Sequence, residues 1–164
     1  SHLTQQKDAG VFSRFTFVTR SEDPNAIWYK KILDLIDLIV SAREEMNTMR
    51  VFYAQLTSQI HEYISKGLGT DFNTLDKAIK GLNEDRIKYG FSDSDINQLH
   101  DIRFIRNGLV HRDERIKPNA PHTYYLTYAD INKVEHEVYI QDFQKYRIQL
   151  RDMHTKIKKA FQIP

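Results

Sequence analysis

The chain has 164 residues, a formal net charge of +2 and no cysteine, with 40% hydrophobic and 28% charged residues. A chain of this length can bury a stable core without a metal or a disulfide, and the lack of cysteine excludes disulfide frameworks, thiolate zinc sites and cysteine nucleophiles. No apolar run approaches the ~18 residues that a membrane span needs. We therefore expect one soluble domain that does not associate with membranes. The absence of cysteine and of a signal-like N-terminus favours the cytoplasm.

The first 23 residues differ in character from the rest of the chain. Residues 1–3 (SHL) resemble the remnant of a purification tag, so we assign no function to His2. Residues 11–19 (VFSRFTFVT) are rich in β-branched and aromatic side chains, which predicts a strand. Asp23 followed by Pro24 is a typical helix start. The expected organisation is an N-terminal segment over 1–23 and one helical domain over 24–164.

A long first helix is expected from Pro24 to Lys66, with Gly67 and Gly69 ending it. Apolar residues recur at alternating steps of three and four, at Ile32, Leu35, Ile39, Ala42, Met46, Met49, Tyr53, Leu56, Ile60 and Tyr63. Such a stripe is typical either of a coiled-coil seam or of one wall of a helical bundle. The bundle is favoured because helical partners follow, beginning with a second helix from near Asp71 that closes by Gly90.

Two capping-box patterns predict where the remaining helices begin. Ser92 with Asp95 opens a third helix, and Thr127 with Asp130 opens a fourth that continues nearly to the C-terminus. Residues 122–128 (HTYYLTY) are rich in β-branched and aromatic side chains and predict a strand. This strand could pair with residues 11–19 to form a small β-hairpin beside the bundle. The predicted fold is mainly α, a four-helix bundle with a long first helix.

Several common enzyme signatures are missing. The chain contains no Glu-x-x-His pair, no His-Glu-x-x-His, no phosphate-binding loop with Gly, Lys and Ser/Thr, and no Gly-x-Ser-x-Gly. The compact Glu135-His136-Glu137 is interpreted as a solvated face, because adjacent residues of a helix point in different directions. We therefore expect neither a metal nor a cofactor.

The stretch FIRNGLVHRD, residues 104–113, gathers polar groups where the third helix is about to end. On a helix Arg103, Asn107 and His111 share one face, and Arg106 lies beside that face, one residue before Asn107. The planar guanidinium of an arginine can bind a phosphate through several N–H donors, and the imidazole of a histidine can exchange a proton near neutral pH. These four side chains therefore suit phosphodiester chemistry. A stabilising cap on the helix dipole is the alternative. It does not explain Arg103 and Arg106, which are costly to bury unpaired, so we expect them and Asn107 to line a cleft.

Arg106-Asn107-Gly-Leu-Val-His111 resembles the Arg-x4-6-His motif of the HEPN superfamily (higher eukaryotes and prokaryotes nucleotide-binding domain). Arg115/His122 and Arg147/His154 have a similar spacing, but only Arg106 is followed by the polar residue that the family prefers. The resemblance implies a HEPN-like bundle, a homodimer and metal-independent cleavage of RNA. It assigns the scissile phosphate to Arg106, proton transfer to His111 and an orienting role to Asn107.

The sequence also suggests further contacts and other functions. We expect substrate binding by Arg103 and Arg112, and stacking of unpaired bases on Tyr124 and Tyr125. The leading hypothesis is an endoribonuclease of toxin or phage-defence type, with RNA, a second copy and an antitoxin or other protein as partners. The alternatives are a non-catalytic HEPN module that binds a nucleotide, RNA or protein, and a helical scaffold that dimerises through its first helix without a ligand.

Overall fold

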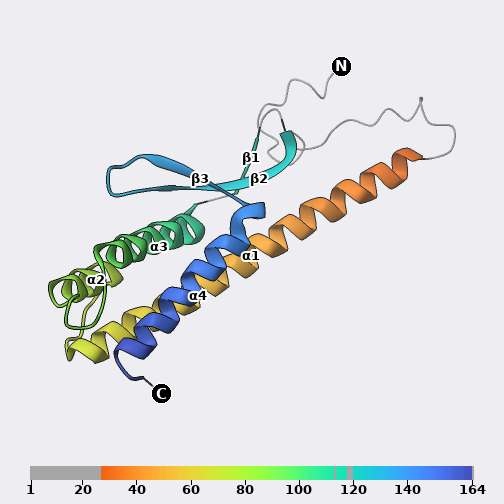
Figure 1. Ribbon diagram of the computed structural model, residues 1–164. Coiled ribbons are helices and arrows are strands. Elements are labelled where there is room, and N and C mark those ends of the chain that lie inside the picture. The colour runs from red at the N-terminus through yellow and green to blue at the C-terminus, as the bar shows by residue number, and fades with distance from the viewer. Residues whose placement is uncertain (1–26, 113, 118–119, 164) are drawn as a thin grey trace.

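The computed structural model describes residues 27–112, 114–117 and 120–163, and Figure 1 shows how their helices and strands are arranged. The helices are α1 (Ile27–Leu68), α2 (Leu75–Glu84), α3 (Asp93–His111) and α4 (Phe143–Ala160), the last preceded by a single 3-10 turn, η3 (Ile140–Asp142). The strands are β1 (Arg115–Lys117), β2 (Ala120–Ala129) and β3 (Glu135–Tyr139). The prediction of a mainly helical fold is confirmed.

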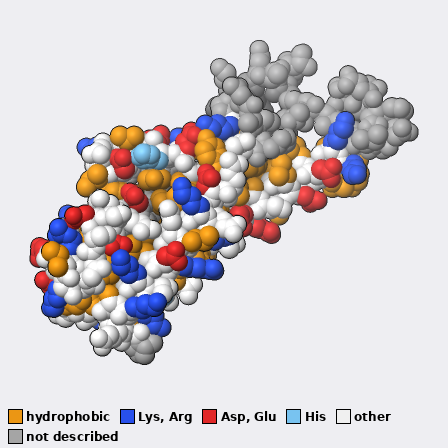
Figure 2. Space-filling view, in the orientation of Figure 1, with side chains coloured by type: hydrophobic (Ala, Val, Ile, Leu, Met, Phe, Trp, Pro, Cys, Tyr) orange, Lys and Arg blue, Asp and Glu red, His pale blue; other side chains and the backbone are white. Residues whose placement is uncertain are grey.

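The long first helix is also confirmed, and it is continuous over 42 residues. At 1.5 Å per residue it spans about 63 Å, so it runs the length of the molecule and projects beyond the other helices (Figure 1). Among its described side chains the first buried one is Ala42, which is 7% exposed, whereas Leu33 and Ile36 on the projecting part are each 41% exposed. Figure 2 shows hydrophobic side chains on the surface of this projecting part. No helix in the described part of the chain combines the length and the apolarity that a membrane span needs.

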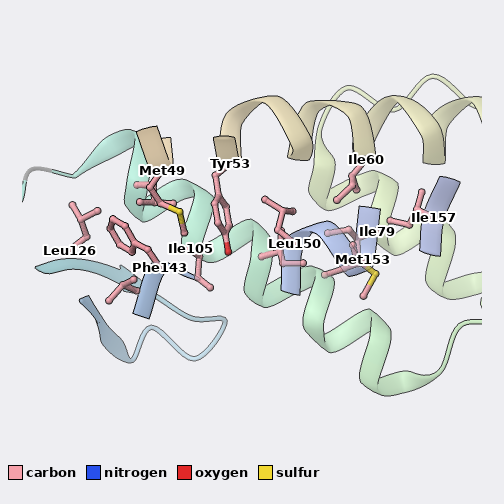
Figure 3. Packing of buried hydrophobic residues seen from close by; sticks show 14 of the residues in the cluster. Met49, Tyr53, Ile60, Ile79, Ile105, Leu126, Phe143, Leu150, Met153 and Ile157 are labelled. Atoms are coloured by element: carbon pink, nitrogen blue, oxygen red, sulfur yellow. The ribbon is translucent and has the colours of Figure 1, made fainter. Parts of the chain in front are cut away.

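The core lies along the second half of α1, where α4 runs beside it. Tyr53 reaches from α1 into the middle of this core, between one group of side chains near the sheet and another near α2 (Figure 3). The first group is Met49, Ile105, Leu126 and Phe143, and the second is Ile60, Ile79, Met153 and Ile157. The apolar stripe of the sequence is therefore a wall of a bundle in its second half.

The capping box predicted at the start of α3 is present. The backbone N–H of Ser92 donates to Asp95 Oδ2 at 2.7 Å, and the backbone N–H of Asp95 donates to Ser92 Oγ at 3.2 Å. The second helix starts later than expected, at Leu75, because Thr74 supplies its cap by accepting a hydrogen bond from Lys77 N.

The second predicted capping box is wrong. Thr127 lies in β2, and Asp130 closes the turn between β2 and β3 by accepting hydrogen bonds from Asn132 N and Val134 N. Asp suits such a turn as well as a helix cap, because its short side chain accepts from nearby backbone N–H groups in both. The fourth helix consequently begins at Phe143, and Glu135-His136-Glu137 belongs to β3.

The β element is a three-stranded antiparallel sheet in the order β1-β2-β3, larger than the expected hairpin. Tyr125 of β2 is paired with Arg115 of β1 on one side and with Tyr139 of β3 on the other. The predicted strand at 122–128 is thus part of β2. Residues 11–19 and the rest of the segment 1–23 lie outside the described residues.

Candidate functional site

The C-terminal half of α3 is fixed by its packing against β2. Gly108, inside the predicted motif, is buried, and a Cβ at this position would lie 2.7 Å from both the carbonyl oxygen of Thr127 and the Cβ of Tyr128. Leu109 beside it is 1% exposed. The glycine therefore lets a strand backbone approach the helix closely.

Arg50 of α1 holds the end of α3 from the other side. Its Nε donates to the carbonyl oxygen of Leu109 at 2.8 Å, and one of its terminal nitrogens donates to Glu114 at 3.0 Å and to the carbonyl oxygen of Arg112 at 3.3 Å. The last carbonyl groups of a helix have no partner within the helix, so Arg50 satisfies groups that would otherwise need water. This contact fixes the motif relative to α1.

A cleft of about 510 Å³ lies between α1, α3 and the start of α2, and we call it the α1/α3 cleft. Its lining is Ala54, Thr57, Ser58 and His61 from α1, Asn73 and Thr74 from the segment before α2, Leu75 and Asp76 from α2, and Arg103, Arg106 and Asn107 from α3. The prediction that Arg103, Arg106 and Asn107 line a cleft is confirmed. The volume lies in the range of small-molecule sites in proteins.

Arg103 is largely enclosed in the wall of the cleft, with 19% of its side chain exposed. One terminal nitrogen lies 3.3 Å from Asp76 Oδ1, and the guanidinium carbon lies 4.1 Å from the centre of the Phe104 ring. Its Nε is buried without a hydrogen-bond partner among the described residues. Asp76 also binds Lys80 at 2.8 Å, and this hydrogen bond is the main reason that the pKa of Asp76 is lowered.

Arg106 is bound only lightly by the protein. It donates to Asn107 Oδ1 at 3.1 Å, and no carboxylate of the described residues forms an ion pair with it. An unpaired guanidinium on the wall of a cleft can give its planar set of donors to an anionic ligand. Asn107 orients the guanidinium and keeps its own amide N–H groups available.

His61 was not singled out in the sequence, yet it lines the same cleft. Its Nε2 lies 2.7 Å from the carbonyl oxygen of Phe72, in the segment between α1 and α2. A carbonyl oxygen only accepts hydrogen bonds, so Nε2 carries a hydrogen and Nδ1 is the nitrogen that can exchange a proton. No local pattern links His61 to Arg106, because 45 positions separate them and only the packing of α1 on α3 joins them.

The structure does not bring every predicted site residue to the cleft. His111 is exposed in the last turn of α3, about 6 Å along the axis beyond Asn107, and is not among the lining residues. Arg112 is turned toward the sheet, where it donates to Thr127 Oγ1 at 2.8 Å and forms an ion pair with Glu135. Arg112 therefore stabilises the junction of α3 and β2.

The two tyrosines expected to stack on bases also lie away from the cleft. Tyr124 is only 5% exposed, so its ring has no free face for a base, and it lines a separate hollow beside the first half of α1. Tyr125 is half-buried, with its ring centre 5.7 Å from that of Tyr139 and 5.2 Å from Lys117 Nζ. Both side chains contribute to the packing of the sheet.

The fold and the site together define a mainly helical protein with a polar cleft that carries two arginines and one histidine. Among the described residues no group of three or more His, Cys, Asp and Glu side chains is placed to hold a metal ion. In comparisons with known proteins, no family model, no curated protein and no solved structure matches the chain.

Proposed function

We propose that the protein is a metal-independent endoribonuclease of the HEPN type. The observation that carries the proposal is the α1/α3 cleft, where Arg103, Arg106 and Asn107 meet and Arg106 has no carboxylate partner among the described residues. Such a cleft suits a phosphodiester, because two guanidinium groups can contact its non-bridging oxygens. The resemblance of RNGLVH to the family motif adds a toxin or phage-defence role in the cytoplasm to the proposal.

The proposed chemistry needs no metal. Arg106 holds the scissile phosphate and stabilises the negative charge that grows on it, while Asn107 keeps the guanidinium in place. The 2′-oxygen of the ribose attacks phosphorus, the bond to the 5′-oxygen breaks, and His111 donates the proton that this leaving oxygen requires. The products are a 2′,3′-cyclic phosphate and a 5′-hydroxyl.

A homodimer is part of the proposal, because His111 lies beyond the cleft of its own chain. Two apolar side chains are exposed on the helices that bear the motif and its neighbour: Val110, which precedes His111 on α3, is 41% exposed, and Val51 on α1 is 65% exposed. A second copy that covers these side chains would bring two motifs together. We expect light scattering at micromolar concentration to give twice the mass of one chain, and a monomer would contradict this part of the proposal.

A non-catalytic module that binds a nucleotide, RNA or partner protein is the second candidate. The position of His111 favours it, since this side chain is exposed outside the cleft that holds Arg106. Such a module would bind RNA through Arg103 and Arg106 without cutting it.

Cleavage of single-stranded RNA in the presence of EDTA tests the two candidates against each other. An active protein should leave 2′,3′-cyclic phosphate ends, spare DNA of the same sequence, and lose about 10²–10⁴-fold of its rate in His111→Ala and in Arg106→Ala. His154→Ala is the matched control, because His154 lies on α4, binds Gln59 at 2.8 Å and is not part of the cleft. Binding without cutting across a broad panel of RNAs would favour the module.

A further inference from the structure

We propose that His61 is the general base of the α1/α3 cleft, the group that takes the proton from the attacking 2′-hydroxyl. This inference rests on the proposed function and adds a catalytic residue from outside the motif. It assigns the two proton transfers of the reaction to two different histidines, His61 on α1 and His111 on α3.

His61 stands on the wall of the cleft that holds the two arginines. His61 lines the α1/α3 cleft together with Arg103 and Arg106, so a phosphodiester that these arginines bind lies in the same cleft as its side chain. It also lines an adjoining hollow of about 500 Å³, which shares Ser58 with the cleft and extends past Lys66 to Asp71. His61 therefore lies at the junction of the two hollows. An RNA chain whose phosphate is bound at Arg106 can place the neighbouring nucleotide in the second hollow.

A backbone carbonyl group binds one nitrogen of the His61 ring and leaves the other available. Because the carbonyl oxygen of Phe72 accepts from Nε2 at 2.7 Å, neutral His61 has its lone pair on Nδ1. The backbone therefore fixes the tautomer that a base requires.

The other proton acceptor of the cleft is already engaged. Asp76 is bound by Lys80 at 2.8 Å and by Arg103 at 3.3 Å, and its pKa is lowered, mainly through the hydrogen bond from Lys80. A carboxylate whose charge is neutralised in this way is a weak base. Among the described lining residues, this leaves the imidazole of His61, through its Nδ1 lone pair, as the group suited to accept the proton.

The reaction balances with these two histidines. Nδ1 of His61 takes the proton of the 2′-hydroxyl as the bond between the 2′-oxygen and phosphorus forms. The bond between phosphorus and the 5′-oxygen breaks, and that oxygen receives a proton from His111. Water can afterwards open the cyclic phosphate to a 3′-phosphate, with the two histidines exchanging roles.

An RNA with sulfur in place of the bridging 5′-oxygen separates a base from an acid. A thiol ionises near pH ~8.5, so the sulfur leaves as a thiolate without help from an acid. We expect His61→Gln to be about 10²–10⁴-fold slower than wild type on both the normal and the sulfur substrate. His111→Ala should be slow on the normal substrate and close to wild type on the sulfur one.

Other results would contradict different parts of the proposal. A normal rate for His61→Gln on ordinary RNA would overturn the role of His61 and leave the proposed function standing. Rescue of His61→Gln by the sulfur substrate would make His61 the acid, and the assignment as base would be wrong. If wild type cuts neither RNA, the proposed function fails and this inference fails with it.

Glutamine is the chosen replacement because its amide can still donate to the carbonyl oxygen of Phe72, so we expect a wild-type circular dichroism spectrum and melting temperature. A measurement on the unaltered protein covers the case in which His61→Gln does not fold. Single-stranded DNA of the substrate sequence, which is not cut, should protect His61 from modification by diethyl pyrocarbonate, as read by mass spectrometry. Unchanged modification of His61 under saturating DNA would overturn the proposal.

Discussion

Gly108 lies so close to Thr127 that the carbonyl oxygen of Thr127 would stand 2.7 Å from a Cβ on residue 108. The contact joins α3 to β2 one residue beyond Asn107, so it fixes the distance between the motif and the sheet. Backbone atoms form this contact, and they cannot move aside as the end of a flexible side chain can.

Gly108→Ala should therefore destabilise the protein, although alanine favours a helix over glycine by about 1 kcal/mol. We expect the free energy of unfolding to fall by about 1–3 kcal/mol, because overpacking forces α3 away from β2. Urea denaturation measures the change. Asn97→Ala, at an exposed position of α3, is the control and should lie within about 0.5 kcal/mol of wild type. A Gly108→Ala protein more stable than wild type would contradict the close approach of α3 to β2.

Arg50→Met should lower the free energy of unfolding by about 1–3 kcal/mol. The substitution keeps the length of the side chain but leaves the carbonyl oxygen of Leu109 and the carboxylate of Glu114, which is 17% exposed, without their main donor. Arg43→Met is the matched control, since Arg43 also pairs with Glu114 but at 3.6 Å and with 55% of its side chain exposed. Thermal or urea unfolding should show a loss below about 1 kcal/mol for the control. Equal losses would show that Arg50 does not anchor α3.

Arg106→Ala should weaken RNA binding without lowering stability. Arg106 has no ion pair among the described residues, so the free energy of unfolding should change by less than about 0.5 kcal/mol. If Arg106 binds a phosphate, the slope of log K against log salt, measured by fluorescence anisotropy, should fall by about 1. Lys159→Ala removes an exposed cation of α4 and should leave the slope unchanged. Equal slopes for wild type and Arg106→Ala would place the phosphate elsewhere.

Asp95 should make stability depend on pH in the acid range. Burial alone would raise the pKa of its carboxyl, but hydrogen bonds from Lys156 and Ser92 outweigh this effect and lower the pKa to about 2. A group whose pKa is lower in the folded state stabilises the fold above its unfolded pKa, and this contribution is lost as pH falls from about 4 to 2. We expect a loss of about 2 kcal/mol over this range in urea titrations, and a smaller loss in Asp95→Asn.

The matched control for this pH dependence is Asp93→Asn. Asp93 opens the same helix but its side chain is 79% exposed, so its replacement should leave the acid loss unchanged. An identical loss in wild type and Asp95→Asn would mean that the pair with Lys156 does not form in solution.

Local patterns in the sequence determined much of the helical framework. The spacing of apolar residues predicted α1, and Ser92 with Asp95 predicted the start of α3, because both depend on contacts within one or two turns of a helix. Helical periodicity likewise placed Arg103 and Asn107 on one face. The cost of burying unpaired guanidinium groups then predicted the cleft that Arg103 and Arg106 line.

Tertiary structure decided the features that depend on distant parts of the chain. Asp130 follows a strand only because β2 finds partners on both sides, and its local hydrogen bonds would suit a helix cap equally well. Tyr124 is buried because β2 packs on α1, which no alternation of aromatic residues specifies. Arg50 meets Leu109 and His61 joins Arg106 because α1 and α3 pack side by side, which the spacing of residues along either helix cannot encode.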